Sequence, residues 1–285
     1  NGGFVSNWES NPVFLNVPID EYEAWIRDAY DTTCITFLGY GGPIVPASIV
    51  NIPDTNFKAA LLANNSINTN GDLEIQCSEA AAYTGTIGVA SLGITDLTGI
   101  EAFTHITELY CSDNLLTSLD VSANTDLFSL YCDANQLTSI DVSANTALVY
   151  FKCSYNQLTA LDVSANTLLA ELFCNDNQLI SLDVSGKTLL TNLDCWNNPF
   201  TSLYVSGAVS LNYLSVFSTQ LASLDLSTNT SLTYLECPLN PLLASLNIQN
   251  GNNANLWGFV ATNNPSLTWI QVDDPSYMNT NWSGG

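Results

Sequence analysis

Residues 127–147 and 148–168 are LFSLYCDANQLTSIDVSANTA and LVYFKCSYNQLTALDVSANTL, and the spacing of Leu, Cys, Val and Asn in the first stretch returns 21 residues later in the second. The cysteines follow the same step, at 21-residue intervals from Cys111 to Cys195. Each copy contains two similar halves, L-x-x-L-x-C-x-x-N and L-x-x-L-x-V-x-x-N. About eight copies run from near Ile106 to Val272, and a fixed period of this length indicates a repeat protein.

The L-x-C and L-x-V segments alternate apolar and polar residues, which is the side-chain period of a β-strand. Stacked coils place equivalent strands about 4.8 Å apart, the spacing of hydrogen-bonded strands. No single coil can bury its apolar side alone, so stability has to come from stacking on neighbours. The sequence therefore predicts a β-solenoid with two short parallel strands per coil over residues 87–272. We expect the Asn after the first strand to bond turn backbone and to tolerate left-handed geometry.

The motif L-x-x-L-x-C-x-x-N-x-L-x-x-L-D-V-x-x-N closely resembles the 21-residue "irregular" nested class of bacterial leucine-rich repeats, which is common in secreted Bacteroidota surface proteins. The stretch from Ile87 to Leu109, IGVASLGITDLTGIEAFTHITEL, is similar to the capped start of internalin-type repeats. The resemblance implies a leucine-rich-repeat fold and ligand binding, often in adhesion, in a secreted or cell-surface protein. It identifies no ligand. Residues 273–285 are polar and Gly-rich, which predicts a linker, with a secretion-sorting domain as one continuation.

Residues 1–86 do not repeat, and we expect them to cap the exposed apolar end of the solenoid. The pattern predicts one helix over residues 20–31 and a second that begins at Pro53-Asp54-Thr55 and runs to Leu62. Residues 34–50 are apolar and broken by Gly and Pro, which favours strand and loop. Cys34 and Cys77 lie outside the regular cysteine row, and a disulfide between them is one way to fix the cap.

One loop in the cap, NTNGDLEI from residue 68 to residue 75 with a Glu four residues later, resembles an EF-hand calcium loop. The ligands that the resemblance implies are the side chains of Asn68, Asn70 and Asp72, the backbone carbonyl of Glu74, and a bidentate Glu79. The chain departs from the pattern at the first ligand, which is Asn rather than Asp, and at residue 73, where Leu replaces Gly. The alternative is a loop that keeps its shape without Ca²⁺.

The charge balance limits the partners. Four Lys and Arg stand against 27 Asp and Glu, a formal charge of −23. Four scattered cations cannot form a patch for phosphate backbones or anionic lipids. Nucleic acid is therefore not expected as a partner and anionic membrane surfaces are disfavoured, while proteins, neutral glycans and divalent cations remain. No apolar run reaches the ~20 residues needed to span a membrane, so membrane insertion is not expected. The scarcity of Lys and the wealth of Asn, Ser, Thr and Asp suggest an extracellular protein.

Catalysis is not expected. His105 is the sole histidine, so a catalytic triad or a His-containing metal site could use only that residue, which we interpret as an ordinary member of the first coil. Acids are abundant enough that carboxylate pairs carry little weight as evidence for a glycosidase. The repeated cysteines lack the C-x-x-C spacing of metal sites, which favours small buried apolar residues over a metal or redox ladder.

The two halves of the coil differ in how much they vary. The second half is nearly constant, as in TSLDVSANT and TALDVSANT, whereas the outward positions of the first half mix aromatic, acidic and amide residues. Such mixtures are typical of protein and carbohydrate recognition, so we predict a ligand-binding face there. The alternative is cross-strand packing of the aromatic rings. The predicted face consists of Tyr110, Tyr131, Tyr150, Lys152, Glu171, Phe173, Asp194, Trp196, Tyr213, Phe217 and Tyr234.

An outward acidic row marks the constant half: Asp120, Asp141, Asp162, Asp183 and Asp225, interrupted by Tyr204. Unit charges ~5 Å apart in water repel by only about 0.8 kcal/mol, so a solvated row is tolerable. Bridging divalent cations and an ice-binding surface are the other interpretations. For the whole chain, the sequence predicts a surface binding module, with a structural or assembly subunit of a cell-envelope or secretion-related complex as the alternative.

Overall fold

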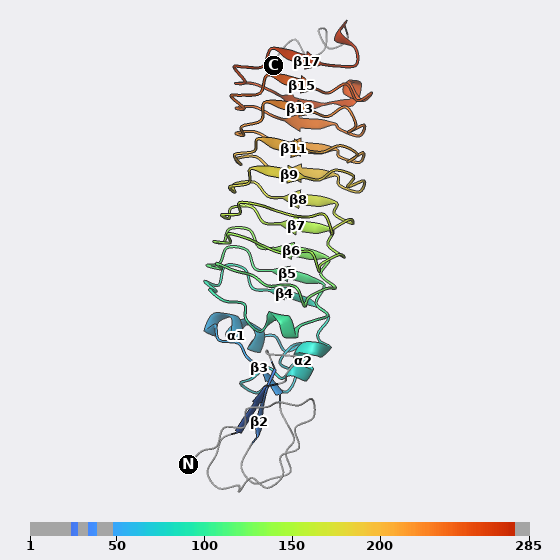
Figure 1. The fold of residues 1–285 in the computed structure, drawn as a ribbon. Coiled ribbons are helices and arrows are strands. Elements are labelled where there is room, and N and C mark those ends of the chain that lie inside the picture. Colours follow the sequence, from blue (N-terminus) through green and yellow to red (C-terminus); the bar gives the residue numbers. More distant parts are fainter. Residues whose placement is uncertain (1–23, 28–33, 39–47, 277–285) are drawn as a thin grey trace, which may run out of the picture.

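The computed structural model describes residues 24–27, 34–38 and 48–276, with side chains from residue 49 onward. The described chain forms a column of stacked coils, with helices at the N-terminal end (Figure 1). The expected leucine-rich-repeat β-solenoid with a helical cap is therefore confirmed. Among the described residues, no helix has the length and apolar character needed to cross a membrane.

A parallel sheet of nine strands runs along one side of the column, and neighbouring strands in it come from successive coils of the chain. Each strand is only three residues long and pairs in register with its equivalent in the next coil, as in Leu130 opposite Phe151. The strands are β4 (Thr86–Gly88), β5 (Glu108–Tyr110), β6 (Ser129–Tyr131), β7 (Tyr150–Lys152), β8 (Glu171–Phe173), β10 (Asn192–Asp194), β12 (Tyr213–Ser215), β14 (Tyr234–Glu236) and β16 (Gly258–Val260).

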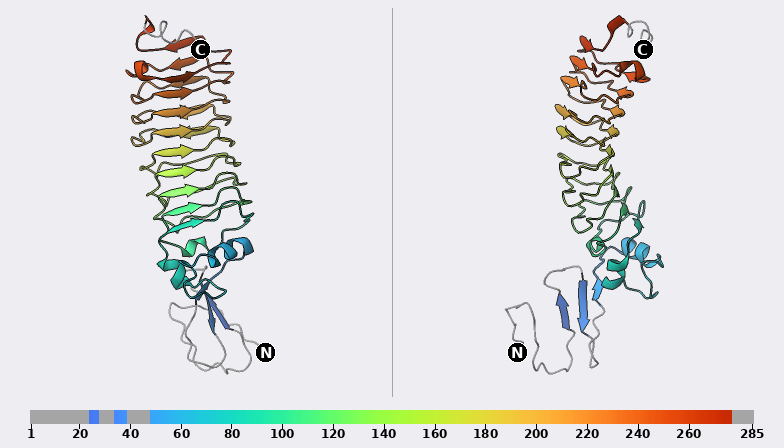
Figure 2. Two further views of the ribbon diagram at one scale, coloured as in Figure 1. Left: turned by 180° about the vertical axis from the view of Figure 1, so that it is seen from behind. Right: turned by 90° about the vertical axis from the view of Figure 1, so that its right-hand side faces the viewer.

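The second strand of the coil forms only from residue 181 onward. Its members are β9 (Ser181–Asp183), β11 (Ser202–Tyr204), β13 (Ser223–Asp225), β15 (Ser245–Asn247) and β17 (Trp269–Gln271). They form two small sheets, β11-β9 and β13-β15-β17. Figure 2 shows strands on both sides of the column in its C-terminal part and on one side in the lower coils. The equivalent residues 118–120, 139–141 and 160–162 form no strand.

Buried asparagines bridge neighbouring coils on the second side. Asn145 donates from Nδ2 to the carbonyls of Val121 and Asn124 in the preceding coil, both at 2.9 Å. Asn166 and Asn229 make the same pair of bonds. At all three junctions the second halves of the coils do not pair as strands.

Strands pair at the junction of β9 with β11 and at that of β13 with β15, where Asn250 donates to the carbonyl of Asn229. Ala208 takes the asparagine position between β9 and β11, and these strands are hydrogen-bonded. Lys187 also replaces an asparagine; its buried Nζ donates to the carbonyl of Asn166 at 3.1 Å, as the amide does elsewhere. Desolvation by burial lowers the pKa of this lysine, although the charges of Asp162 and Asp183 oppose the shift.

A second asparagine row supports the nine-stranded sheet. Asn135 donates from Nδ2 to the carbonyls of Cys111 and Cys132, at 3.0 and 3.1 Å, and its Oδ1 accepts from the N–H of Leu116. The bonds to turn backbone are as expected, but the left-handed residue is the one before the asparagine. The residues with φ between 52° and 58° at this position are Asp113, Ala134, Tyr155, Asp176, Asn197, Ser218, Leu239 and Asn263.

The cysteines of the repeat point into the solenoid. Cys111, Cys132, Cys153, Cys174, Cys195 and Cys237 are free and buried. They lie in one continuous core with the leucine and valine rows. Burial raises the pKa of Cys111 to about 12. No group of three or more His, Cys, Asp or Glu in the described part of the chain is placed to hold a metal ion.

The cap contains the helices α1 (Thr55–Leu62) and α2 (Cys77–Ala82), and the 3-10 helices η1 (Ile100–Ala102) and η2 (Asn253–Asn255) lie within the repeats. The start of α1 is as predicted, because Asp54 caps it by accepting from the N–H groups of Asn56 and Phe57. The other oxygen of Asp54 accepts from the N–H and hydroxyl of Thr95 and so joins the cap to the first coil.

An antiparallel sheet precedes these helices: β1 (Ala24–Arg27), β2 (Cys34–Leu38) and β3 (Ser48–Val50). The helix predicted over residues 20–31 is therefore wrong at residues 24–27, and its remainder lies outside the described residues. A helix of that length is marginal on its own, whereas pairing with β2 satisfies the backbone of β1. Cys77 is disulfide-bonded, whereas the side chain of Cys34 lies outside the described part.

Candidate ligand-binding face

The eleven residues predicted to bind a ligand all lie on the nine-stranded sheet or directly after its strands. Nine stand at the outer positions of strands, while Trp196 and Phe217 follow β10 and β12 by two residues. All eleven are partly exposed, whereas the residue between each pair of outer positions is buried. We call this surface the aromatic face. In Figure 2 (left view) its strands run from β4 at the helical end to β16.

The first group on the aromatic face is built around a lysine. The rings of Tyr110 and Tyr131 lie 4.7 Å apart. Nζ of Lys152 lies 4.5 Å from the ring centroid of Tyr131 and 4.9 Å from that of Phe173. Because β6, β7 and β8 pair in register, the ammonium group is held between the two rings. Lys152 thus joins three neighbouring coils.

The second group consists of stacked rings. Trp196 and Phe217 are stacked at 4.8 Å with planes 6° apart, and the ring of Tyr155 meets Trp196 edge-on at 6.2 Å. Tyr213 and Tyr234 are stacked at 5.0 Å. The rings therefore pack on one another along the solenoid axis, as the cross-strand alternative expected.

Tyr234 is also covered from the C-terminal side. The ring of Trp257 lies 4.8 Å from it, and Gly258 passes directly beneath. A Cβ on Gly258 would come within 2.2 Å of the Tyr234 ring, so the absence of a side chain makes room for the tyrosine. Trp257 is itself 76 % exposed.

The carboxylate of Asp194 lies within this group. Asp194 pairs in register with Phe173 on one side and Ser215 on the other. Desolvation by burial, together with the charges of Glu236 and Asp176, raises the pKa of Asp194 to about 6. Its Oδ1 is buried and has no hydrogen-bond partner. Buried polar atoms are normally paired, so the unpaired Oδ1 distinguishes Asp194 from the other acids of the face.

The neighbouring acids are held by the surface itself. Glu236 accepts from the hydroxyl of Tyr234 at 2.8 Å and from that of Ser215 at 3.4 Å. Asp176 accepts from the amides of Asn175 and Asn197. These contacts fix the direction of both carboxylates but leave their charge uncompensated.

Three members of this surface are not among the residues predicted from the sequence: Tyr155, Asp176 and Trp257. Tyr155 and Asp176 stand at the left-handed turn position, which the repeat pattern marks as turn rather than sheet. Burial and the charges of Asp176 and Asp194 raise the pKa of Tyr155, which places its hydroxyl near both acids. A tyrosine at a turn position is itself a signal, because a bulky residue there needs a compensating contact. Trp257 lies in an insertion that breaks the period.

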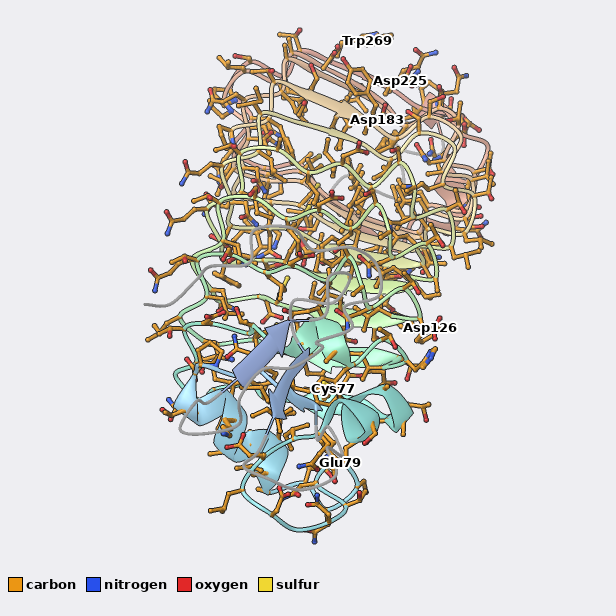
Figure 3. The ribbon with its side chains drawn as sticks, turned by 60° about the horizontal axis from the view of Figure 1, so that its bottom comes forward. Cys77, Glu79, Asp126, Asp183, Asp225 and Trp269 are labelled. Atoms are coloured by element: carbon orange, nitrogen blue, oxygen red, sulfur yellow. The ribbon has the colours of Figure 1, made fainter. Side chains whose placement is uncertain are left out.

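The predicted calcium loop is organised by hydrogen bonds. Glu79 accepts from the N–H of Thr69, Asn70 and Gln76 and from the hydroxyl of Thr69. Partial burial opposes ionisation, but these bonds outweigh it and lower the pKa of Glu79. Lys58 forms an ion pair with Glu74 at 2.6 Å. Glu79 lies at the end of the column that carries the cap (Figure 3).

The other predicted ligands also bond within the loop. Asp72 accepts from the N–H of Glu74 and from the amides of Asn70 and Gln76. Asn68 is buried and donates to the carbonyl of Asp72, while its Oδ1 is unpartnered. The carboxylate oxygens of Asp72 and Glu79 are therefore engaged by the protein, an arrangement that does not match a preformed cation site. Calcium binding stays a prediction.

The acidic row on the second side has a local role. Each of its aspartates accepts from the N–H of the serine two residues later, as Asp162 does from Ser164 at 2.8 Å, and so fixes the turn. This bond and the serine hydroxyl lower the pKa of Asp162. Figure 3 labels Asp183 and Asp225 on this side of the column. The row with this bond is Asp120, Asp141, Asp162, Asp183 and Asp225.

No protein-family model and no curated protein matches the chain. Among solved structures, the functional domain of InlJ from Listeria monocytogenes, described as including a cysteine ladder, is 28 % identical, with a TM-score of 0.43; the match covers 77 % of this chain and 59 % of that chain. Internalin C2 from the same organism is 18 % identical over 79 % of this chain and 88 % of its own, with a TM-score of 0.48.

The leucine-rich-repeat domain of APL1B is 16 % identical, with a TM-score of 0.43; the match covers 67 % of this chain and 73 % of that chain. The chain thus spans less than two thirds of the InlJ domain that it matches.

Proposed function

We propose that this chain is a non-catalytic protein-binding module of a secreted or cell-surface protein, and that its aromatic face holds the ligand. The observation that carries the proposal is the contrast between the two sides of one coil. The second side repeats its outward Asp and Ser with little change, and each Asp has a structural bond. The outward positions of the aromatic face, in contrast, differ from coil to coil. They bear partly exposed rings and carboxylates without a compensating charge.

A protein ligand fits this surface better than a glycan does. Sugars stack on the faces of aromatic rings, but Trp196 is covered by Phe217 on one face and also contacts the perpendicular ring of Tyr155. Tyr234 is likewise enclosed by Tyr213 and Trp257. Rings that are packed on one another beside carboxylates support contact with peptide N–H groups and basic side chains. Glycan binding is the second ligand class.

A structural or assembly role is the second function that we propose. Among the described residues, β16 and β17 are end strands of their sheets. Trp269 and Ile270 on β17 are exposed, whereas Leu246, the equivalent of Ile270, is buried. End strands with open backbone groups are sites for pairing with another chain. The size distribution of the full chain tests this role: concentration-dependent association that Ile270→Asp abolishes supports it, and a monomer at all concentrations contradicts it.

The test of the binding proposal uses photo-crosslinking from the face. Benzoylphenylalanine replaces Tyr150 on the aromatic face or, as a control, Tyr204 on the second side. Candidate ligands are surface proteins of neighbouring cells and, in parallel, a glycan array. We expect crosslinked protein from position 150 only, and its loss in a triple variant, Tyr131→Ser, Phe173→Ser and Trp196→Ser.

The matched control is a second triple variant that removes exposed apolar side chains elsewhere: Ile180→Ser, Leu189→Ser and Tyr204→Ser. Circular dichroism of both variants checks that the solenoid is intact. If the first variant crosslinks as strongly as the wild-type chain, the aromatic face is not the binding surface.

A further inference from the structure

We propose that the group around Asp194 is an anchor for an arginine side chain of the protein ligand. In the bound state the guanidinium lies on the Asp194 carboxylate, between the edges of Trp196 and Tyr155 and the ring of Tyr213. This inference rests on the proposed function, because it names the chemistry of the ligand that the aromatic face takes.

The first support is that no described side chain supplies a cation there. Among the described residues, Lys58 pairs with Glu74 in the cap, and Nδ1 of His105 lies 3.0 Å from a carboxylate oxygen of Asp126 at the first coils. Lys152 is held on the far side of Phe173, between two rings, and Lys187 is buried on the second side. Asp194 and Asp176 therefore face the ligand side with their charge unbalanced. A cationic ligand is the complement of this charge.

The second support is the state of the Asp194 carboxylate. It is partly desolvated between Phe173 and Ser215, and its Oδ1 is buried without a partner. Leaving an acceptor desolvated and unpaired is unfavourable, the more so for a charged group. A cation that contacts the exposed part of this carboxylate compensates its charge, and the hydrogen-bonded acids of the face gain less from such a contact. Glu236, in contrast, already accepts from Tyr234.

The third support is the surroundings of the carboxylate, which select the kind of cation. Burial together with the charge of Asp194 raises the pKa of the Tyr213 hydroxyl, and Asp194 also contributes to the raised pKa of Tyr155, so both rings lie close to this acid. An arginine is planar, donates two parallel hydrogen bonds to one carboxylate and packs against aromatic rings. A lysine ammonium keeps its hydration more strongly and lacks the second donor direction, which makes it the weaker fit.

The experiment uses the full chain and the peptide acetyl-Gly-Arg-Gly-Arg-Gly-amide. The indole N–H signal of Trp196 in a ¹H–¹⁵N NMR spectrum, assigned by its loss in Trp196→Phe, reports on the site. A counterpart with citrulline in place of arginine has nearly the same shape without charge. We expect a saturable shift of the Trp196 signal with the arginine peptide and at least tenfold weaker binding of the citrulline peptide.

Two isosteric variants separate this site from general attraction to an acidic protein. Asp194→Asn removes the anchor, and Asp183→Asn makes the same change of net charge on the second side. We expect at least tenfold weaker binding for Asp194→Asn and less than a twofold change for Asp183→Asn. Equal weakening by both variants, equal binding of the citrulline peptide, or no saturable shift overturns the proposal.

This outcome is distinguishable from failure of the proposed function. Crosslinking from residue 150 can still depend on the aromatic residues while Asp194→Asn leaves the affinity for the arginine peptide unchanged. In that case the aromatic face binds a protein, but Asp194 is not an arginine anchor. If no protein crosslinks from residue 150 either, the proposed binding function is wrong.

Discussion

The side-chain amide of Asn156 donates to the carbonyl of Cys132, 24 residues earlier in the chain, at 3.0 Å. It also donates to the carbonyl of Cys153 in its own coil, and its Oδ1 accepts from the N–H of Leu137. One buried side chain thus satisfies three backbone groups in two adjacent coils. Since buried backbone groups must be paired, Asn156 is a structural residue that holds two coils together, not a surface turn residue.

We therefore expect Asn156→Ala to lower the free energy of unfolding by about 2–4 kcal/mol, because three buried backbone groups lose a partner. The neighbouring exposed residue gives the control, Gln157→Ala, for which we expect a change within about 0.5 kcal/mol. Denaturant unfolding followed by circular dichroism measures both. Equal stability of the two variants would contradict the role of the asparagine.

The repeat cysteines should not react with alkylating reagents in the folded chain. Their thiols are buried, and burial raises the pKa of Cys153 and Cys174 well above that of a free thiol. We expect no alkylation of the six repeat cysteines by iodoacetamide at pH 8 within hours, and complete alkylation in denaturant. An exposed thiol introduced by Gln157→Cys is the positive control. Peptide mapping by mass spectrometry would show any modified repeat cysteine in the folded state, which would argue against the inert core assignment.

Asp194 should make stability depend on pH in the sense opposite to most carboxylates. Its pKa is raised from 3.8 to about 6, mainly by desolvation, so its favourable contribution is complete below pH 3.8 and is lost as the pH rises through 6. We expect Asp194→Asn to be more stable than the wild-type chain by ~1–3 kcal/mol at pH 8, with the difference vanishing at pH 3.5. Asp183→Asn, with the same change of charge, should lack this pattern. A difference independent of pH would refute the assignment.

Any side chain at position 258 should lower stability for steric reasons. A methyl group there meets the Tyr234 ring at 2.2 Å, so the ring has to leave its place between Tyr213 and Trp257. We expect Gly258→Ala to cost about 1–3 kcal/mol and to weaken any ligand that contacts Tyr234. Gly88→Ala is the matched control, because Gly88 lies in the other end strand of the same sheet with open space at its Cβ position. If the two substitutions cost the same, the contact with Tyr234 does not govern stability here.

Glu79 tests both the cap and the calcium prediction. Hydrogen bonds from Gln76, Thr69 and Asn70 lower its pKa despite partial burial, so the stability it contributes is present above the unfolded pKa and lost as the pH falls below it. We expect Glu79→Gln to destabilise the cap at pH 7 and less so at pH 3. Calorimetric titration with Ca²⁺ completes the test. Heat from the wild-type chain that Glu79→Gln abolishes would confirm calcium binding, and no heat would end that prediction.

Much of the fold follows from the repeat alone, because the period specifies every inward side chain. The start of α1 was predictable for the same reason, since Asp54 carries a local capping signal. The strand at residues 24–27 was not, because its partner β2 is supplied by tertiary pairing rather than by its own pattern. The missing second strands were not predictable either, because residues 118–120 (SLD) form no strand whereas residues 181–183, which are identical to them, form β9.

The aromatic face was predictable as a set of positions but not as a set of contacts. The period places Tyr213 and Tyr234 on neighbouring strands, and they stack there. It does not indicate that Tyr155 reaches across a whole coil to Trp196, because that contact depends on side-chain direction from a turn. Nor does it show that Asp194 keeps an unpaired oxygen, which is a property of the packing around it.

The in-register pairing of the nine-stranded sheet has a consequence for how this surface can change over generations. Residues that touch across the aromatic face, such as Tyr131 and Lys152, are 21 positions apart in the chain. Duplication or loss of one 21-residue unit would therefore lengthen or shorten the face by one strand, which is about 4.8 Å. The strands away from that unit would keep their neighbours. A lineage can thus alter the reach of the surface and its chemistry as separate inheritable traits, the first by copying whole units and the second by point substitution within them.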